Sequence, residues 1–190
     1  MKIVGLLLAA GSATRFGSDK LRHALPHGVS IAIQSARTLR AELPEVIVVV
    51  RRRDAAAAFE QEQCRVAVCE NAHEGMGASL ACAARAAGAQ DGYIVALADM
   101  PFLRRTTIAA VREAIERGAA IAAPYFRARR GHPVGIGGRF YQQLIELKGD
   151  EGARRLLAEN ERALVKIPVG DPGAVRDIDR PEDLAPQVRV

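Results

Sequence analysis

Apolar and polar positions alternate along the chain in blocks that predict strands and helices in regular succession. Three runs, Ile3–Leu8, Val46–Val50 and residues 93–98, contain almost no polar side chain, which is typical of strands buried on both faces of a sheet. Residues 29–43 instead place apolar side chains at helical spacing, and Met76–Ala87 forms an alanine-rich helical segment. Strands and helices therefore follow one another from the first residues onward.

The same alternation continues through the rest of the chain. We expect Asp54 to cap the second helix, Pro124 to end a strand, and residues 126–138 to form a mobile loop. The further expected elements are strands at residues 66–69, 119–123 and 163–168 and around Val134, helices at residues 55–63, 106–117, 140–147 and 152–160, and a turn at Pro181–Leu184.

This order of elements predicts the fold class. Strands that alternate with helices form a doubly wound, mostly parallel sheet, so we expect a single α/β domain over residues 1–190. In such sheets ligands bind beyond the carboxyl ends of the strands. We therefore expect the functional residues in the loops at residues 9–20, 69–76 and 98–103, which gather at that edge.

The composition narrows the kind of ligand. Hydrophobic residues make up 49% of the 190 positions and aromatic residues only 4%, so aromatic stacking is not expected to drive binding. The net charge of +5 comes from arginines that are scattered in small groups rather than gathered in one stripe. Nucleic-acid binding needs such a stripe or a known motif, so we expect anionic small molecules and no nucleic acid.

Cysteine usage and hydropathy indicate the compartment. Cys64, Cys69 and Cys82 are odd in number and lack the spacing of zinc ligands, so we expect small buried residues in a reducing, cytoplasmic setting. No apolar stretch reaches membrane-spanning length, and no membrane partner is expected. The first residues also resemble a secretory signal, but cleavage there would delete the first strand, so we favour the strand.

The loop after the first strand predicts a site for a nucleotide triphosphate. Residues 9–20 combine several small residues with Gly11, Arg15 and Lys20. Small residues let the backbone approach phosphate oxygens, and the two cations balance their charge. The loop is neither a Walker loop nor a Gly-x-Gly-x-x-Gly fingerprint, because it has the spacing of neither.

Two carboxylates are candidates for a metal site. Asp99 directly follows the third apolar run, at the expected carboxyl end of a central strand. A carboxylate there suits Mg²⁺, which prefers hard oxygen ligands and keeps phosphates in its shell; the alternative is a helix cap or a turn. Asp179, in the acidic segment 177–183, is a candidate second ligand, or else it caps the turn that follows.

Three further segments carry polar residues of interest. In the first, Gly75 permits a close approach, and Asn71 and Ser79 offer hydrogen bonds near a helix start that favours anions; an ordinary loop with a cap is the simpler interpretation. His132 could orient a substrate, although a lone histidine is more often structural. Residues 149–154 are typical of a helix start with acidic residues at its positive end.

Together these segments resemble the molybdenum cofactor cytidylyltransferase group of the MobA-like nucleotidyltransferase superfamily. The motifs match in order over nearly the whole chain. The first loop and Ala98-Asp99-Met100-Pro101 specify the superfamily only. The group is narrowed by Gly131-His132-Pro133-Val134, by Gly149-Asp150-Glu151-Gly152-Ala153-Arg154, and by the segment from Asp177 to Leu184.

The resemblance implies a Rossmann-like nucleotidyltransferase fold and a reaction. The phosphate of a molybdopterin-type cofactor would attack the α-phosphate of CTP, giving a cytosine dinucleotide cofactor and pyrophosphate. Ala10 favours cytosine, because this group pairs Ala-Ala-Gly with CTP and Ala-Gly-Gly with GTP. The implied cofactor is Mg²⁺, and the implied partners are the two substrates and a molybdoenzyme or its maturation chaperone.

The resemblance also implies roles for individual residues. Arg15 and Lys20 would neutralise charge on the α-phosphate and the leaving pyrophosphate, and Asp99 would hold Mg²⁺. The nucleotide would contact Leu8, Ala9, Ala10, Gly11, Ser12, Arg15, Lys20, Asn71, Gly75, Ser79 and Asp99, and the acceptor would contact His132, Asp150 and Arg154.

Other functions remain open from the sequence. Within the transferases, the chain could be a guanylyltransferase for the same pterin or a cytidylyltransferase for a sugar or polyol phosphate. A nicotinamide-dependent oxidoreductase could use this fold, although the missing dinucleotide fingerprint weakens that hypothesis. A non-catalytic protein that binds and delivers a finished dinucleotide cofactor is the third alternative.

Overall fold

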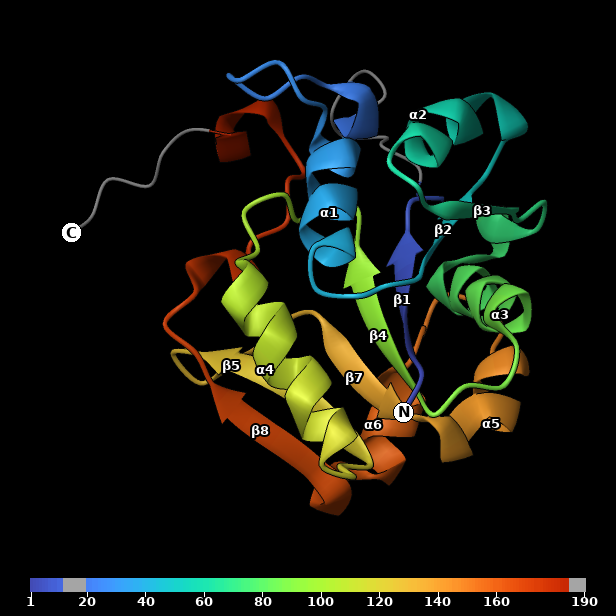
Figure 1. Ribbon diagram of the computed structural model, residues 1–190, viewed down its shortest axis with the longest axis vertical. Coiled ribbons are helices and arrows are strands. Elements are labelled where there is room, and N and C mark those ends of the chain that lie inside the picture. The colour runs from blue at the N-terminus through green and yellow to red at the C-terminus, as the bar shows by residue number, and fades with distance from the viewer. Residues whose placement is uncertain (12–19, 185–190) are drawn as a thin grey trace.

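The computed structural model describes residues 1–11 and 20–184, and within them one eight-stranded sheet runs through the molecule (Figure 1). Its strands lie in the order β3-β2-β1-β4-β7-β5-β6, with β8 paired to β5. Pairing is parallel from β3 through β4, as the sequence predicts. The strands are β1 (Ile3–Leu8), β2 (Val46–Val50), β3 (Arg65–Val68), β4 (Gly92–Leu97), β5 (Ile121–Phe126), β6 (Arg129–Arg130), β7 (Val134–Gly137) and β8 (Leu164–Pro168).

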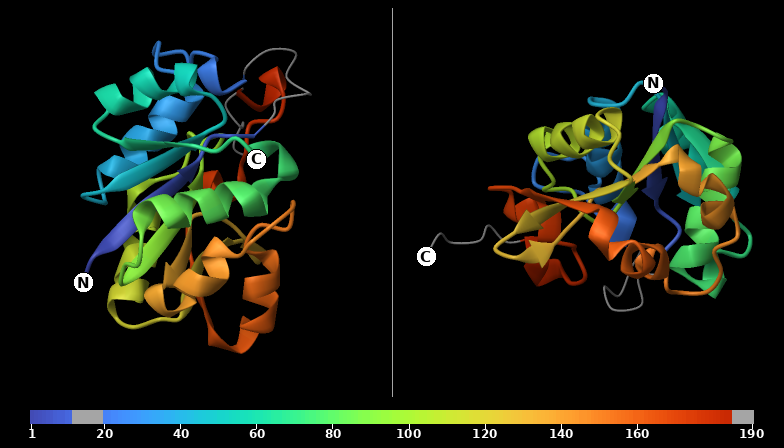
Figure 2. Two further views of the ribbon diagram at one scale, coloured as in Figure 1. Left: turned by 90° about the vertical axis from the view of Figure 1, so that its right-hand side faces the viewer. Right: turned by 90° about the horizontal axis from the view of Figure 1, so that it is seen from below.

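Helices cover both faces of this sheet, which confirms the doubly wound α/β fold (Figure 2). One core packs α1, α2 and α4 against the sheet, and the other core packs α3, α5 and α6 against the opposite face. The helices are α1 (Ile31–Arg40), α2 (Ala56–Gln61), α3 (Met76–Ala87), α4 (Arg105–Glu116), α5 (Tyr141–Ile145) and α6 (Arg154–Glu159).

The two cores explain why the central strands are apolar without interruption. In β1, Leu6 and Leu8 face the core under α3, whereas Ile3 and Leu7 face the core under α1 and α4. Every residue of β1 and of β2 is buried. A strand covered on both sides has no solvent face on which a polar residue would be favoured.

Residues 126–138 differ from the expected mobile loop, in which only a short strand around Val134 was predicted. That segment forms β6 and β7, and β7 runs antiparallel to both β4 and β5. Arg127 and Ala128 take left-handed φ values of 47° and 63°, which makes the tight two-residue turn that a hairpin favours. Neither residue is a glycine, so the sequence does not predict this turn.

Two expected boundaries are wrong for local reasons. Pro124 does not end β5, because the strand continues beyond it, pairing with β8, and its carbonyl accepts a hydrogen bond from the Gly131 N–H (2.8 Å). Proline lacks only the donor, and pairing with β7 has already ended at Ala122. Asp54 does not cap α2: the N-cap is Ala55, and Asp54 lies one residue before it, in a 3₁₀ turn, where it forms an ion pair with Arg52 (3.4 Å).

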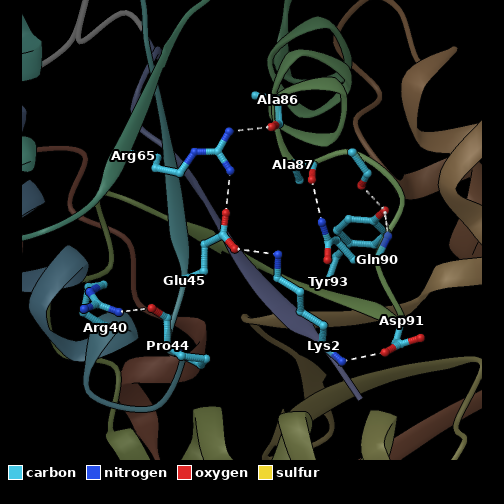
Figure 3. A network of polar contacts seen from close by, with 11 residues as sticks. Lys2, Arg40, Pro44, Glu45, Arg65, Ala86, Ala87, Gln90, Asp91 and Tyr93 are labelled. Carbon is cyan, nitrogen blue, oxygen red and sulfur yellow. Dashed lines mark hydrogen bonds and ion pairs between the residues drawn. The ribbon is translucent and has the colours of Figure 1, made fainter.

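A charged network ties the amino-terminal ends of four strands together (Figure 3). Glu45 before β2 accepts from Arg65 of β3 (2.5 Å) and pairs with Lys2 before β1 (3.0 Å). The Lys2 backbone N–H donates to Asp91, just before β4. These contacts lie at the edge opposite to the predicted ligand site, and they help to fix the register of the parallel strands.

The carboxyl-terminal segment is pinned against the loop between β4 and α4. Asp171 is buried and accepts hydrogen bonds from the Arg104 N–H (2.9 Å), the Thr107 hydroxyl (2.7 Å) and the Gly173 N–H (2.9 Å). A Cβ on Gly173 would lie only 2.1 Å from the Phe102 carbonyl oxygen, so only glycine allows this approach. The segment therefore returns to the end of β4.

The cysteines agree with the expectation of small, mostly buried residues. All three are free; Cys64 and Cys69 are buried and Cys82 is partly exposed. Burial raises the pKa of Cys64 to about 11 and, more strongly, the pKa of Cys69 to about 12. In the part of the chain that the structure describes, no helix is long and apolar enough to cross a membrane.

We expect Asp171→Ala to lower the free energy of unfolding by about 2–3 kcal/mol, because it leaves buried donors without a charged acceptor. Asp177→Ala is the matched control, since Asp177 is exposed; it should change the stability by less than about 0.5 kcal/mol. Urea unfolding of the two variants measures the difference. Equal stabilities would show that the Asp171 contacts do not hold the segment.

Candidate active site

The carboxyl ends of β1, β2, β3 and β4 meet at one edge of the sheet, and a cleft opens there. Both β1 and β4 point toward this edge in Figure 1. The cleft has a volume of about 560 Å³. The described residues that line it are Leu8, Ala10, Gly11, Arg51, Ala72, His73, Glu74, Gly75, Met76, Ser79, Leu97, Asp99 and Asp150.

Ala10 and Gly11, at the described start of the first loop, lie between this cleft and a second one. Ala10 and Gly11 line both cavities, whereas Ala9 lines only the second, a cavity of about 770 Å³ beside α1 and α2. Ser12 and Arg15, which the sequence places in the nucleotide site, lie outside the described residues. The small residues after β1 thus separate the two clefts.

The start of α3 forms the opposite wall of the first cleft. Gly75 has φ +127°, and a Cβ there would lie 2.6 Å from the Gly149 carbonyl oxygen. Gly77 donates its N–H to that same oxygen (2.8 Å). The two glycines therefore let residues 149–150 close onto the helix start, and Ser79, which is buried, faces the cleft one turn further on.

Asn71 lies outside this wall. Its side chain is exposed and contacts the Cys69 thiol (3.2 Å) and Glu74 (3.4 Å), and it is not among the described residues that line the cleft. These contacts order the loop between β3 and α3. Its predicted contact with the nucleotide stays a prediction.

Lys20 joins the two predicted metal ligands. Its ammonium nitrogen lies 2.9 Å from Asp99 Oδ2 and 2.9 Å from Asp179 Oδ1. Burial would lower the pKa of Lys20, but the hydrogen bonds and negative charges of Asp99 and Asp179 outweigh it and raise that pKa. The amine is therefore charged, and it bridges two carboxylates that are 80 positions apart in the chain.

Asp179 reaches this position because its segment is docked independently. The Ile178 N–H donates to the Asp99 carbonyl oxygen (2.9 Å). The Ile178 side chain is fully buried in a small core with Leu25 and Ile31. The neighbouring carboxylate is thereby carried to the end of β4.

The two carboxylates fit a divalent metal ion. Asp99 Oδ1 is buried and has no hydrogen-bond partner among the described residues, although its other oxygen is bonded to Lys20. An uncompensated buried carboxylate oxygen is costly unless something binds it. The described residues hold no group of three or more potential metal ligands, so phosphate oxygens and water would complete the shell of an ion such as Mg²⁺.

His132 lies next to this edge, just before β7. Burial lowers the pKa of its imidazole, although a hydrogen bond with the Val95 backbone and the charge of Asp99 act in the opposite direction. Its Nδ1 is buried without a partner in the described part of the chain. His132 is not among the described residues that line either cleft, so its predicted contact with the acceptor stays a prediction.

The other two residues predicted for the acceptor are placed differently. Asp150 lines the same cleft as Gly11 and Asp99, and its carboxylate faces the Met76 N–H at the start of α3 (3.4 Å). Arg154 is exposed at the first position of α6 and is not among the described residues lining that cleft. Asp150 thus shares one cavity with part of the predicted nucleotide set, namely Leu8, Ala10, Gly11, Gly75, Ser79 and Asp99.

Arg51 is a site residue that the sequence reasoning missed. It follows β2 directly, lines both clefts, and forms no hydrogen bond or ion pair within the described residues. Its neighbours Arg52 and Arg53 pair with Asp54 (3.4 Å) and Glu60 (3.2 Å). The pattern that singled out Asp99, a charged residue directly after a buried apolar strand, also marks Arg51.

The family of the chain is shown by comparison with known proteins. Residues 5–164 match the family described as the MobA-like NTP transferase domain. The chain belongs to this family. It is therefore a nucleotidyltransferase, and the cleft at the end of β1 and β4 is its candidate active site.

Individual relatives cover nearly the whole chain. The purine catabolism protein PucB of Bacillus subtilis is 32% identical over 95% of this chain and 93% of its own. The nicotine blue oxidoreductase of Paenarthrobacter nicotinovorans is 28% identical over 96% and 94%. A solved nucleotidyl transferase from Methanothermobacter has the same fold, with a TM-score of 0.80, 22% identity, and coverage of 96% of this chain and 94% of its own.

The lowered pKa of His132 gives this nucleotidyltransferase a pH-dependent stability. The unfolded chain takes up a proton on this residue below about pH 6.5, whereas the native protein resists it, so the contribution is complete above pH 6.5 and is lost as the pH falls. We expect His132→Gln to flatten the dependence of unfolding free energy on pH between 5 and 6.5, measured by urea unfolding. An unchanged slope would contradict a neutral His132 in the native state.

Proposed function

We propose that this nucleotidyltransferase transfers CMP from CTP to the phosphate of a molybdopterin-type cofactor and releases pyrophosphate. The observation that carries the nucleotidyl transfer is the convergence of Asp99, Asp179 and Lys20 beside a cleft lined by small loop residues and a helix start. The choice of CTP and of the pterin acceptor depends on the sequence resemblance, through Ala10 and the motifs around His132 and Asp150.

In this reaction an acceptor phosphate oxygen attacks the α-phosphorus of CTP. The bond from that phosphorus to the oxygen bridging the β-phosphate breaks, and pyrophosphate leaves with the electron pair. Positioning and charge neutralisation are sufficient for such an in-line displacement, and no covalent enzyme intermediate is needed. The chain must therefore hold two anions close together and stabilise the charge that develops between them.

The residues of the cleft are suited to these tasks. Gly11 presents backbone without a side chain in the way. The positive end of the dipole of the 12-residue helix α3 faces the cleft and favours phosphate, and Ser79 lies in the first turn of that helix. Arg51, which has no ion-pair partner among the described residues, adds a positive charge between the two clefts.

Asp99 and Asp179 would hold the Mg²⁺ ion. When bound, such an ion neutralises phosphate charge and orients the α-phosphate for attack. The unpartnered Asp99 Oδ1 is an oxygen available to it. The role of His132 toward the acceptor depends on the sequence resemblance.

The position of Asp150 supports an acceptor that approaches along the wall at the start of α3. A carboxylate in the same cleft as Asp99 suits the hydrogen-bond donors of a pterin ring. The product would pass to a molybdoenzyme or its maturation chaperone. We place this step in the cytoplasm, where the free thiols stay reduced.

The alternatives differ in what they release. A guanylyltransferase or a sugar- or polyol-phosphate cytidylyltransferase releases pyrophosphate with another nucleotide or acceptor. A delivery protein binds the finished dinucleotide and releases none. The name of the 28% identical relative is that of an oxidoreductase, and that activity would appear as oxidation of a reduced nicotinamide.

Pyrophosphate release tests the proposal directly. With Mg²⁺ and molybdopterin cofactor, we expect release from CTP and not from GTP, ATP or UTP. Asp99→Asn should lower kcat by about 100-fold or more, because it weakens the metal site, while the exposed Asp177→Ala keeps wild-type activity. Release with GTP alone would assign a guanylyltransferase, and full activity of Asp99→Asn would remove the metal assignment.

Arg51 provides a second test with a matched control beside it. We expect Arg51→Gln to raise KM for the triphosphate about tenfold, the loss of one charge-assisted hydrogen bond. Arg53→Gln removes the same charge two positions away, from a side chain that is already paired with Glu60, and should change KM less than twofold. Equal effects of the two variants on KM would show that Arg51 acts only through its general positive charge and does not contact the triphosphate.

A further inference from the structure

The position between Asp99 and Asp179 already holds a cation of the protein itself. The Lys20 ammonium is within 2.9 Å of one oxygen from each carboxylate, and its side chain is only 12% exposed. A divalent ion that bridges the same two carboxylates would lie beside this nitrogen even if it used Asp99 Oδ1 rather than Oδ2, because the two oxygens of one carboxylate are next to each other. Two cations in contact repel each other strongly in a partly buried site, so the ammonium and the metal exclude one another there.

We propose that Lys20 is a positioning residue that occupies the metal position in the substrate-free protein and leaves it only when a triphosphate offers its ammonium another anion. The divalent cation then enters together with the nucleotide rather than before it. This inference depends on the metal site of the proposed function, but it does not depend on which base or which acceptor is used.

The exchange of the Lys20 ammonium for a metal ion is favoured because a charge left without an opposite charge in this partly buried site raises the free energy. Without a cation between them, the carboxylates of Asp99 and Asp179 would repel each other near the buried Asp99 Oδ1. Without an anion, a displaced and largely buried ammonium would also be costly. A triphosphate provides several negative charges in the adjoining cleft, which a flexible four-carbon side chain is able to reach.

The ion triad is not needed to hold the segment that carries Asp179. That segment is fixed by the hydrogen bond from Ile178 to the Asp99 carbonyl and by the burial of Ile178. Lys20→Met should therefore fold with Asp99 and Asp179 still adjacent. The role of Lys20 as a substitute cation is thus separable from a purely structural ion pair.

Binding of Mn²⁺, followed by the electron paramagnetic resonance of the free ion, tests the exchange without any turnover. If Lys20 occupies the site in more than nine-tenths of the molecules, its removal tightens Mn²⁺ binding about tenfold or more. We expect this gain for Lys20→Met in the absence of nucleotide. Lys2→Met, which removes one positive charge at the opposite end of β1, should leave the Mn²⁺ affinity unchanged.

Two further measurements identify the site and use the wild-type protein. Adding Asp99→Asn to Lys20→Met should abolish the gain. In the wild type, inorganic tripolyphosphate should tighten Mn²⁺ binding about tenfold after its own affinity for the ion is subtracted. Equal Mn²⁺ affinities of wild type and Lys20→Met, or wild-type binding that tripolyphosphate leaves unchanged, would overturn the exchange.

The two proposals can fail separately. Tight Mn²⁺ binding by Lys20→Met with no pyrophosphate release from any nucleotide would support the exchange and refute the proposed reaction. Pyrophosphate release by the wild type with no gain in Lys20→Met would support the reaction and refute the exchange.

Discussion

The parallel alignment of β1, β2, β3 and β4 is the constraint on which the site depends. Because the four strands run the same way, their carboxyl ends lie at one edge, where Gly11, Arg51 and Asp99 follow β1, β2 and β4. Burial on both faces fixes this alignment, since a slip of one residue would exchange the side chains of the two cores. The position of the cleft therefore follows from the packing of the sheet.

The elements that a local sequence pattern indicates could be predicted from the sequence. Uninterrupted apolar runs gave β1, β2 and β4 nearly to the residue, and Asp99 was identified by its place directly after such a run. A strand around Val134 was predicted and is β7, but its antiparallel pairing and the hairpin of β5 and β6 could not be predicted, because the hairpin turn uses Arg127 and Ala128 instead of glycine. Periodicity does not reveal the direction in which a short strand pairs.

The meeting of distant residues was the other limit of prediction. Asp179 was a candidate ligand because it lies in an acidic segment. Its contact with Lys20 depends on the docking of Ile178, and no local sequence pattern indicates that docking. Asp150 shares the cleft with Asp99 because Gly75 and Gly77 leave room for it, and a sequence motif does not show which wall it will join. Distances between segments come from packing, and packing is set by the whole chain.

Because α3 closely approaches residues 149–150, the cleft is lined by two parts of the chain that are far apart in the sequence. Most of its lining comes from the first hundred residues, whereas the wall at Asp150 is added from a later segment through the gap left by two glycines. A change of length or sequence in that later segment reshapes one side of the cavity and leaves the central strands intact. Sequence differences in this one segment are therefore sufficient to alter the cavity wall at Asp150, while Asp99 and Arg51 keep their places after the central strands.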